Sequence, residues 1–230
     1  MNSVKAIFMK QAKDVMKNPM ALVMFLTFPV VALIMTNLVE IEDYPNNNMF
    51  VTMMAAIFAG MGLITAVSDA VAEDIERKCL RFLVIAGVKP YQYLIGAGGF
   101  FFAAGAVTSV VFALIGDFTL QETFKFLAIM VAGVAASVLL GATIGMYAKN
   151  RQTATALGMP IAVLVGFTPM IAGFNETVEK FAGILYTQQI NVIVNDFSAS
   201  LRRPLLVVGA NVLVLSVLFV VAYRRKGLKG

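Results

Sequence analysis

Six long apolar runs constrain the fold of this chain more than any other feature of its sequence. They cover residues 20–39, 49–72, 91–116, 123–148, 153–174 and 204–223. A helix needs about 20 apolar residues to cross a bilayer, and each run meets that length. Hydrophobic residues make up 60% of the chain and charged residues 13%, which is typical of an integral membrane protein. The sequence therefore predicts an all-α polytopic membrane protein, with six transmembrane helices in a single domain over residues 1–230.

Basic residues are distributed unevenly between the two ends of these runs. When both termini and residues 73–90 are placed on one side of the membrane, that side holds fourteen Lys and Arg residues. The other side holds four, which are Lys125, Lys180, Arg202 and Arg203. Because Lys and Arg are enriched in cytoplasmic loops, we expect a multi-pass protein of the cell (plasma) membrane with both termini cytoplasmic. The same placement accounts for the net charge of +5 without a nucleic-acid partner.

Two further segments are unsuited to crossing a bilayer. Residues 3–18 carry apolar residues on one helical face and lysines elsewhere, which predicts an interfacial helix along the membrane surface. A cleaved signal peptide is the rival interpretation, but no small-residue cleavage site follows. Residues 175–203 form an extracytoplasmic insert with two short apolar pieces, 178–186 and 190–197, separated by the polar residues 187–189. A re-entrant or interfacial helix pair is expected there.

Residues 73–90 form the one long charged segment between apolar runs. Its apolar residues at helical spacing are Ile75, Cys79, Phe82, Leu83 and Ala86, which predicts one amphipathic helix. Acidic residues occupy its first turn and basic residues follow, an order that suits the helix dipole. Favourable i,i+4 ion pairs are expected for Glu73–Arg77 and Asp74–Lys78. Gly87 is expected to cap this helix, and Pro90 to end it and begin the next. Either it rests on lipid headgroups, or it docks a soluble partner.

Several kinds of chemistry are missing from the sequence. The chain has no histidine and a single cysteine, Cys79, so it offers no histidine-based catalysis, no zinc-type cluster and no internal disulfide. It also lacks the Gly-x-x-x-x-Gly-Lys-Ser/Thr motif of nucleotide-binding loops. The middles of the apolar runs contain no Asp, Glu, Lys or Arg, which disfavours a proton-coupled transporter. We therefore expect no cofactor in this chain, and an energy source elsewhere.

Three short motifs carry a resemblance to a known family. They are Glu73-Asp-Ile-Glu-Arg77, Leu80-x-Phe-Leu83 and Pro90-x-x-Tyr93-Leu-Ile-Gly96. With the basic helix that ends in Lys17-Asn18-Pro19, they resemble the permease subunits of type-2 ABC transporters over the whole chain. Two positions depart from that pattern. The family commonly has Gly-Thr in place of Lys78-Cys79, and Lys in place of Ala97.

The resemblance implies that residues 73–90 are a coupling helix, seated in a cleft of a separate ABC ATP-binding subunit that binds ATP and Mg. The docking residues expected from it are Glu73, Asp74, Arg77, Leu80, Arg81, Phe82, Leu83, Gly87 and Pro90. Two permeases, either identical or related, and two ATP-binding subunits would form an exporter. The chain itself would not be an enzyme.

The substrate implied by the resemblance is amphipathic: a peptide toxin or antimicrobial peptide, a drug or a lipid. We expect the substrate path to involve the second and fifth spans near a dimer axis, with Pro160 and Pro169 in the fifth. Two other functional classes remain open. One is a membrane scaffold or immunity protein that binds a partner without transport, and the other is a secondary transporter, which the absence of charges within the spans disfavours.

Overall fold

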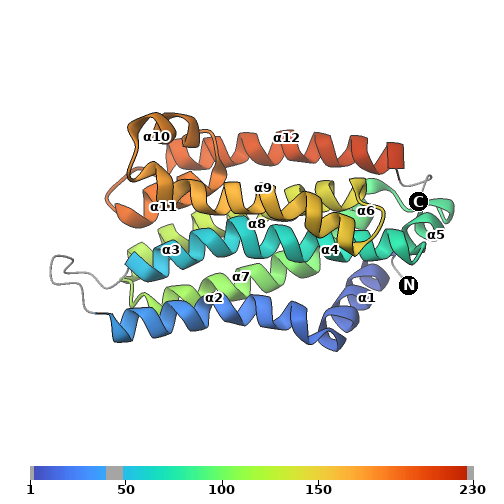
Figure 1. Cartoon of the computed structure of the whole chain (residues 1–230), viewed down its shortest axis with the longest axis horizontal. Helices are drawn as coiled ribbons and strands as arrows, with labels where there is room; N and C mark the ends of the chain where they lie inside the picture. The colour runs from blue at the N-terminus through green and yellow to red at the C-terminus, as the bar shows by residue number, and fades with distance from the viewer. Residues whose placement is uncertain (1–2, 40–48, 227–230) are drawn as a thin grey trace.

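Long helices lying side by side form the body of the protein, with α2 and α12 at opposite edges (Figure 1). The computed structural model describes residues 3–39 and 49–226, and these contain no strand. Within them, five helical segments are long and apolar enough to cross a membrane: Met49–Glu76, Pro90–Ile115, Leu120–Tyr147, Arg151–Ala172 and Arg202–Arg225. A sixth is reached when α1 and α2 count as one segment bent by 67°. The all-helical class is thus confirmed, with five or six spans.

The helix bounds follow the predicted runs within a few residues. The helices before the insert are α1 (Ser3–Lys17), α2 (Pro19–Leu38), α3 (Met49–Ile57), η1 (Phe58–Gly62), α4 (Leu63–Glu76), α5 (Cys79–Ile85), α6 (Pro90–Tyr93), η2 (Leu94–Gly98), α7 (Gly99–Ile115), α8 (Leu120–Tyr147) and α9 (Arg151–Ala172). The remainder are α10 (Glu176–Ala182), α11 (Tyr186–Asn195) and α12 (Arg202–Lys226). The main difference is at the second span, which continues four residues beyond the predicted end at residue 72.

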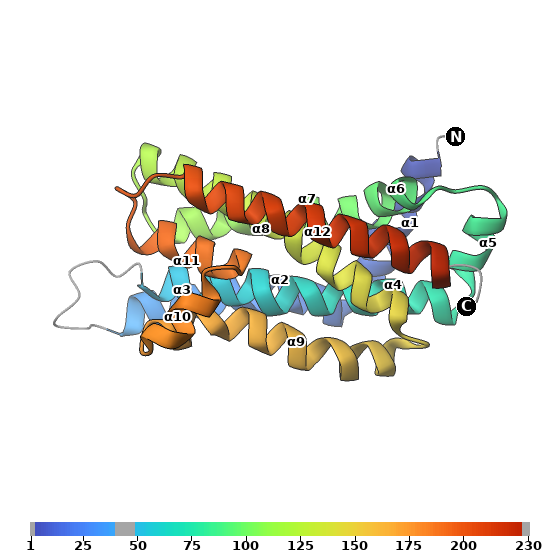
Figure 2. The same cartoon turned by 90° about the horizontal axis from the view of Figure 1, so that it is seen from above.

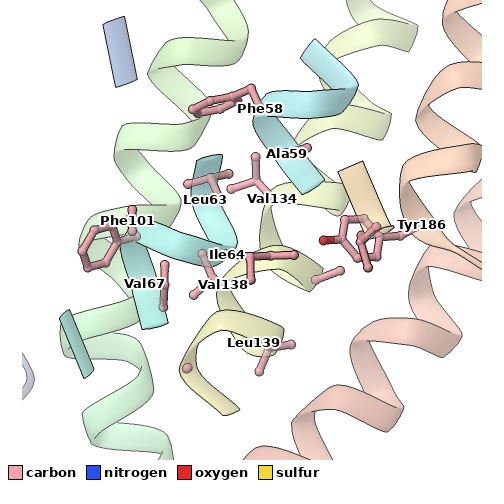
Figure 3. Packing of buried hydrophobic residues seen from close by; sticks show 14 of the residues in the cluster. Phe58, Ala59, Leu63, Ile64, Val67, Phe101, Val134, Val138, Leu139 and Tyr186 are labelled. Carbon is pink, nitrogen blue, oxygen red and sulfur yellow. The ribbon is translucent and has the colours of Figure 1, made fainter. Parts of the chain in front are cut away.

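The second span, α3–η1–α4, runs through the centre of the bundle. Seen from above, it lies between α9 on one side and α7 and α8 on the other (Figure 2). In its most apolar stretch 83% of residues are buried, compared with 17% for α12. Figure 3 shows its Leu63 and Ile64 packed toward Val134 and Val138 of α8. The most buried of the five described spans is therefore the one that continues directly into the charged segment.

Two glycines of α8 allow close contact with this central span. A Cβ atom at Gly141 would lie 2.7 Å from the carbonyl oxygen of Ile64, and one at Gly145 would lie 2.7 Å from that of Ser68. No side chain fits at such distances, so the backbones of α4 and α8 approach as small-xxx-small motifs permit. This glycine pair therefore serves the packing of α8 against the central span.

A π-helical turn, η1, interrupts the second span at mid-length. A π turn shifts the backbone hydrogen bonds to i→i+5, as in the bond from Leu63 N–H to the Phe58 carbonyl. The hydroxyl of Ser137 on α8 donates to the neighbouring Ala59 carbonyl at 2.5 Å. The same hydroxyl lies 3.0 Å from the Tyr186 hydroxyl at the start of α11. Because no water replaces such bonds inside a bilayer, these side chains stabilise the turn.

The insert between the last two spans contains α10 and α11, joined at a break at residues 183–185. The sequence placed the break at the polar residues 187–189, and that was wrong. Those residues lie in the first turn of α11 and are buried, with Thr187 donating to the Val165 carbonyl at 2.7 Å and Gln189 to the Gly183 carbonyl at 2.7 Å. Polar side chains that satisfy backbone carbonyls start this helix rather than ending it. α11 therefore lies within the bundle, against α3, α8 and α12.

Candidate functional site

The charged segment lies at one end of the bundle, together with α1 and the C-terminal end of α12 (Figure 1). The helices α10 and α11 lie at the other end. This places the termini-proximal helices and residues 73–90 at the same end, as the distribution of basic residues predicted. The end that carries α5 is called the turn end below.

The prediction of one helix starting at Glu73 was wrong. Residues up to Glu76 are the last turn of α4, and a separate short helix, α5, begins at Cys79. Between them Lys78 adopts a left-handed backbone conformation with φ of 58°. Glycine is favoured there, and glycine is the residue that the resemblance noted above led us to expect at position 78. The spacing of the apolar residues could not reveal this break in the helix, because the residue at the break is a lysine rather than a glycine or proline.

The apolar residues of α5 point in two directions. Leu80 is buried at 2% exposure, and Leu83 packs against the core. Phe82 and Ile85 are 69% and 67% exposed, and Arg81 is exposed beside them. Phe82 and Leu83, which were predicted to share one stripe, therefore point apart: Leu83 and Leu80 form an inward pair that holds α5, and Phe82 and Ile85 form an outward pair available for contact.

The end of α5 is fixed by hydrogen bonds of the Schellman type. The N–H of Val88 donates to the Leu83 carbonyl at 3.0 Å, and the N–H of Gly87 to the Val84 carbonyl at 3.0 Å. Gly87 has φ of 79°, the conformation that this cap requires. Pro90 is the first residue of α6. The predicted roles of Gly87 as cap and Pro90 as the start of the next helix are both confirmed.

A buried polar network holds the base of the segment. Asp74 is 2% exposed, and its carboxylate accepts hydrogen bonds from the ammonium of Lys10 and, at 2.8 Å, from the hydroxyl of Tyr93. The expected pair of Asp74 with Lys78 is therefore wrong. Lys10 also pairs with Asp14 at 3.1 Å. Burial alone would lower the pKa of Lys10, but the charge and hydrogen bond of Asp74, together with Asp14, raise it above the ordinary lysine value. One carboxylate thus ties together α1, α4 and α6.

The same network reaches the last helix. The Tyr93 ring lies 5.8 Å from the Tyr223 ring of α12, centroid to centroid. The Tyr223 hydroxyl in turn donates to the Val88 carbonyl at 3.0 Å. Three residues further along from Tyr93, a Cβ atom at Gly96 would lie 2.7 Å from Cβ of Ile7. Tyr93 and Gly96 of the third motif therefore receive α1 and hold the turn.

Ion pairs connect the segment to the start of α9. Glu73 binds Arg77 at 2.7 Å, which confirms the predicted i,i+4 pair, and its other carboxylate oxygen lies 3.5 Å from Arg151. The backbone N–H of Arg151 donates to Glu76 at 3.2 Å. The acidic residues that the sequence assigned to a first helical turn are thus used, at a helix end, to bind the N-terminus of a neighbouring helix.

A comparison with known protein families identifies the family of this chain. A family model described as ABC-2 type transporter matches residues 2–191, and no curated protein matches the chain. The chain belongs to the ABC-2 type transporter family. It is a type-2 ABC transporter permease. Permease domains of this family are the non-catalytic transmembrane part of transporters, and the family implies a membrane and an ABC ATP-binding partner.

The two prolines that were predicted to lie on a substrate path have different environments in the permease. Pro169 is buried and lines a cavity of about 880 Å³ beside Thr52 and Ile57 of the second span. Pro160 is exposed on the outside of α9. At 1.5 Å per residue the two lie about 13 Å apart along the helix. The fifth and second spans therefore do meet at a cavity, but only Pro169 reaches it.

Sequence reasoning missed four residues that shape the turn end of the permease: Lys10, Ile85, Arg151 and Tyr223. Ile85 lies three residues after Phe82, so helical spacing alone could have paired them. The other three act across 64 to 135 residues, and no local pattern marks such partners. In the part of the chain that the structure describes, no group of three or more His, Cys, Asp or Glu side chains is placed to hold a metal ion.

Proposed function

We propose that this permease couples ATP hydrolysis by a separate ABC ATP-binding subunit to export of an amphipathic substrate across the plasma membrane. The observation that carries the proposal is the outward pair on α5, Phe82 and Ile85, presented at the tip of the turn end. Large apolar side chains exposed outside the spans are typical of an interaction surface. The proposed assembly has two permease copies, or this permease and a relative, with two ATP-binding subunits on the cytoplasmic face.

The rigidity of the turn supports this role. Motion is transmitted by elements that move as a body, and α5 is held by Leu80, by the cap at Gly87 and by the network at Asp74. That network joins α4, which ends the most buried of the five spans and leads directly into α5, to α1 and α6. A displacement imposed on Phe82 would therefore reach the centre of the bundle rather than being absorbed in a loose loop.

The docking residues now fall into two groups. Phe82 and Ile85 are the proposed anchors, and Arg77 and Arg81, both exposed, set the orientation of the partner. Exposed ion pairs contribute about 0.2–1 kcal/mol, whereas a buried central anchor contributes about 2 kcal/mol or more. The second group, Asp74, Leu80, Leu83, Glu73, Gly87 and Pro90, would act from within the permease by holding the turn in place.

Alanine substitution of Phe82 tests the proposal. Phe82→Ala is expected to leave the permease inserted, since the side chain is largely exposed, and to weaken binding of the ATP-binding subunit by roughly thirtyfold. The measurement is a pull-down of that subunit, with substrate-stimulated ATP hydrolysis in reconstituted membranes. Phe181→Ala on α10 is the matched control, because Phe181 is 74% exposed and lies at the opposite end. Equal binding and equal transport by both variants would refute docking through α5.

Orientation is tested separately by labelling introduced cysteines in a Cys79→Ser background. An impermeant thiol reagent applied to intact cells is expected to label a cysteine at position 121 and to leave one at position 89 unmodified. Labelling of position 89 would place the turn end outside the cell. A permease that inserts as expected but binds no ATP-binding subunit would support the alternative, a membrane scaffold or immunity protein.

A further inference from the structure

The cavity of about 880 Å³ lies at the end of the bundle opposite to α5, among α3, α9 and α11. Its size falls within the range of about 300–1,000 Å³ that is usual for ligand pockets. Much of its wall is methionine and phenylalanine, namely Met49, Met53, Met170, Phe174 and Phe197. Unbranched, polarizable methionines adapt to ligands of different shape. The wall is therefore suited to a flexible apolar chain or ring system.

Polar groups line another part of the same cavity. They include the side chains of Asn191 and Asn195 and the carboxylates of Glu122 and Asp196. None of the described residues that line it is a lysine or arginine. The cavity therefore combines an apolar wall with an edge of negative charge.

Both carboxylates accept hydrogen bonds from neutral donors, and the charge of Asp196 also interacts with the nearby ammonium of Lys125. Glu122 accepts from the backbone N–H of Thr119 at 2.9 Å, and Asp196 from that of Ser198 at 2.9 Å. Hydrogen bonds from Ser198 lower the pKa of Asp196, so it is ionised at neutral pH. The nearby ammonium of Lys125 is held by the Phe197 carbonyl at 2.6 Å and does not line the cavity.

The sequence around this end has the same sign of charge. The described segments that join the spans here, residues 116–125 and 173–203, contain five acidic and four basic residues. The whole chain, by contrast, has a net charge of +5. A concentration of negative charge around an opening attracts cations and repels anions.

We propose that this cavity binds cationic amphiphiles, with the apolar part against the methionine–phenylalanine wall and the positive group at Glu122 and Asp196. The proposal rests on the proposed function, since it names the class of amphipathic substrate that the permease handles at this end. It goes beyond the proposed function by specifying the charge of the ligand: an anionic amphiphile of the same size and apolar area should not bind in the cavity. The choice of a cation follows from charge complementarity between ligand and edge.

The absence of tryptophan from the chain gives a direct assay. A single tryptophan introduced as Phe174→Trp places an energy donor in the cavity wall. The acceptor is trimethylammonium-diphenylhexatriene, titrated into permease in nanodiscs of zwitterionic lipid. We expect saturable energy transfer that exceeds the transfer from a Leu206→Trp control. Leu206 is exposed on α12, near the end of the bundle that holds the cavity, so a tryptophan there reports only probe dissolved in lipid. Dodecyltrimethylammonium should displace the probe, and dodecyl sulfate should not.

Charge-removing variants in the Phe174→Trp background then locate the positive group. Glu122→Gln keeps the helix-capping hydrogen bonds, and Asp196→Asn keeps an acceptor for Ser198. Exposed pairs contribute a factor of roughly 1.5 to 5 each, so the double variant should bind the cationic probe roughly 2- to 30-fold more weakly. The control is Glu176→Gln with Glu179→Gln, which removes two charges from exposed α10 and should change binding by less than that.

Two results would overturn the inference. One is saturable binding of the carboxylate derivative of the same probe as tightly as the cationic form, and the other is unchanged binding in the Glu122–Asp196 double variant. No ATP-binding subunit is present in this assay, so either result leaves the docking of α5 untouched. Conversely, cation-selective binding by a permease that captures no ATP-binding subunit would refute the proposed function and leave the cavity assigned.

Discussion

Replacement of Tyr93 by phenylalanine removes one hydroxyl from the network below the turn and leaves the ring in place. That hydroxyl donates to the Asp74 carboxylate at 2.8 Å, in a buried site. A hydrogen bond to a charged group contributes about 1.5–3 kcal/mol. For a chain of this length 1 kcal/mol corresponds to about 2–4 °C in melting temperature. Tyr93→Phe is therefore expected to lower the melting temperature by about 3–12 °C, measured by fluorescence-detected size exclusion of heated, detergent-solubilised permease.

The chain contains a matched control two residues away. Tyr91→Phe makes the same chemical change at a side chain that is 54% exposed, where surface substitutions stay within about 0.5 kcal/mol. A double variant with Asp74→Asn should lose less than the sum of the two single changes, because both act on one hydrogen bond. The network would not stabilise the turn end if Tyr93→Phe had the same melting temperature as Tyr91→Phe. The same would follow if the loss of stability in the double variant equalled the sum of the two single losses.

Further substitutions test individual features by the same melting assay. Lys78→Gly relieves a left-handed backbone conformation and should stabilise the permease by up to about 1 kcal/mol. Gly87→Ala should destabilise it by about 1 kcal/mol, because Gly87 has φ of 79° although the space around it is open. Changes of the same sign in both variants would contradict the backbone argument. Gly141→Ala should cost about 1–3 kcal/mol through overpacking, while Gly209→Ala, with nothing within 4 Å, should not destabilise. Because the pKa of Lys10 is raised, its contribution is complete below the ordinary lysine pKa and is lost only as pH rises through the raised value. Lys10→Met should therefore cost the same at pH 6 and pH 9, and a cost confined to pH 6 would contradict that sign.

The spans were predictable because lipid permits few alternatives. A run such as residues 123–148 must form a helix to satisfy its own backbone, and it does so as α8. Helical capping was equally local, so Gly87 and Pro90 were placed correctly. The glycine pair in α8 was also readable from the sequence, since only small residues allow the contact that it makes.

The residues at which α4 ends and α5 begins were not predictable, because these helix ends depend on partners far away in sequence. The acidic residues after residue 72 suited the start of a helix by composition, yet Asp74 is bound by Lys10 and Tyr93, and Glu73 by Arg151. Those contacts extend α4 to Glu76 and turn Leu80 inward. The sequence showed which residues make up the charged segment, but whether each one points inward or outward required the three-dimensional structure.

The bond between Tyr223 and Val88 has a consequence for the order in which the permease is made. It joins residues 135 positions apart, and the family match ends at residue 191, before α12 begins. During synthesis Lys10, Asp74 and Tyr93 leave the ribosome long before Tyr223 does. Until the last span inserts, the Val88 carbonyl lacks this donor and the turn is unfinished. A chain that stops short of Tyr223 thus carries every residue of the proposed docking surface and still lacks the contact that completes the turn, so the turn is finished only after α12 has been made.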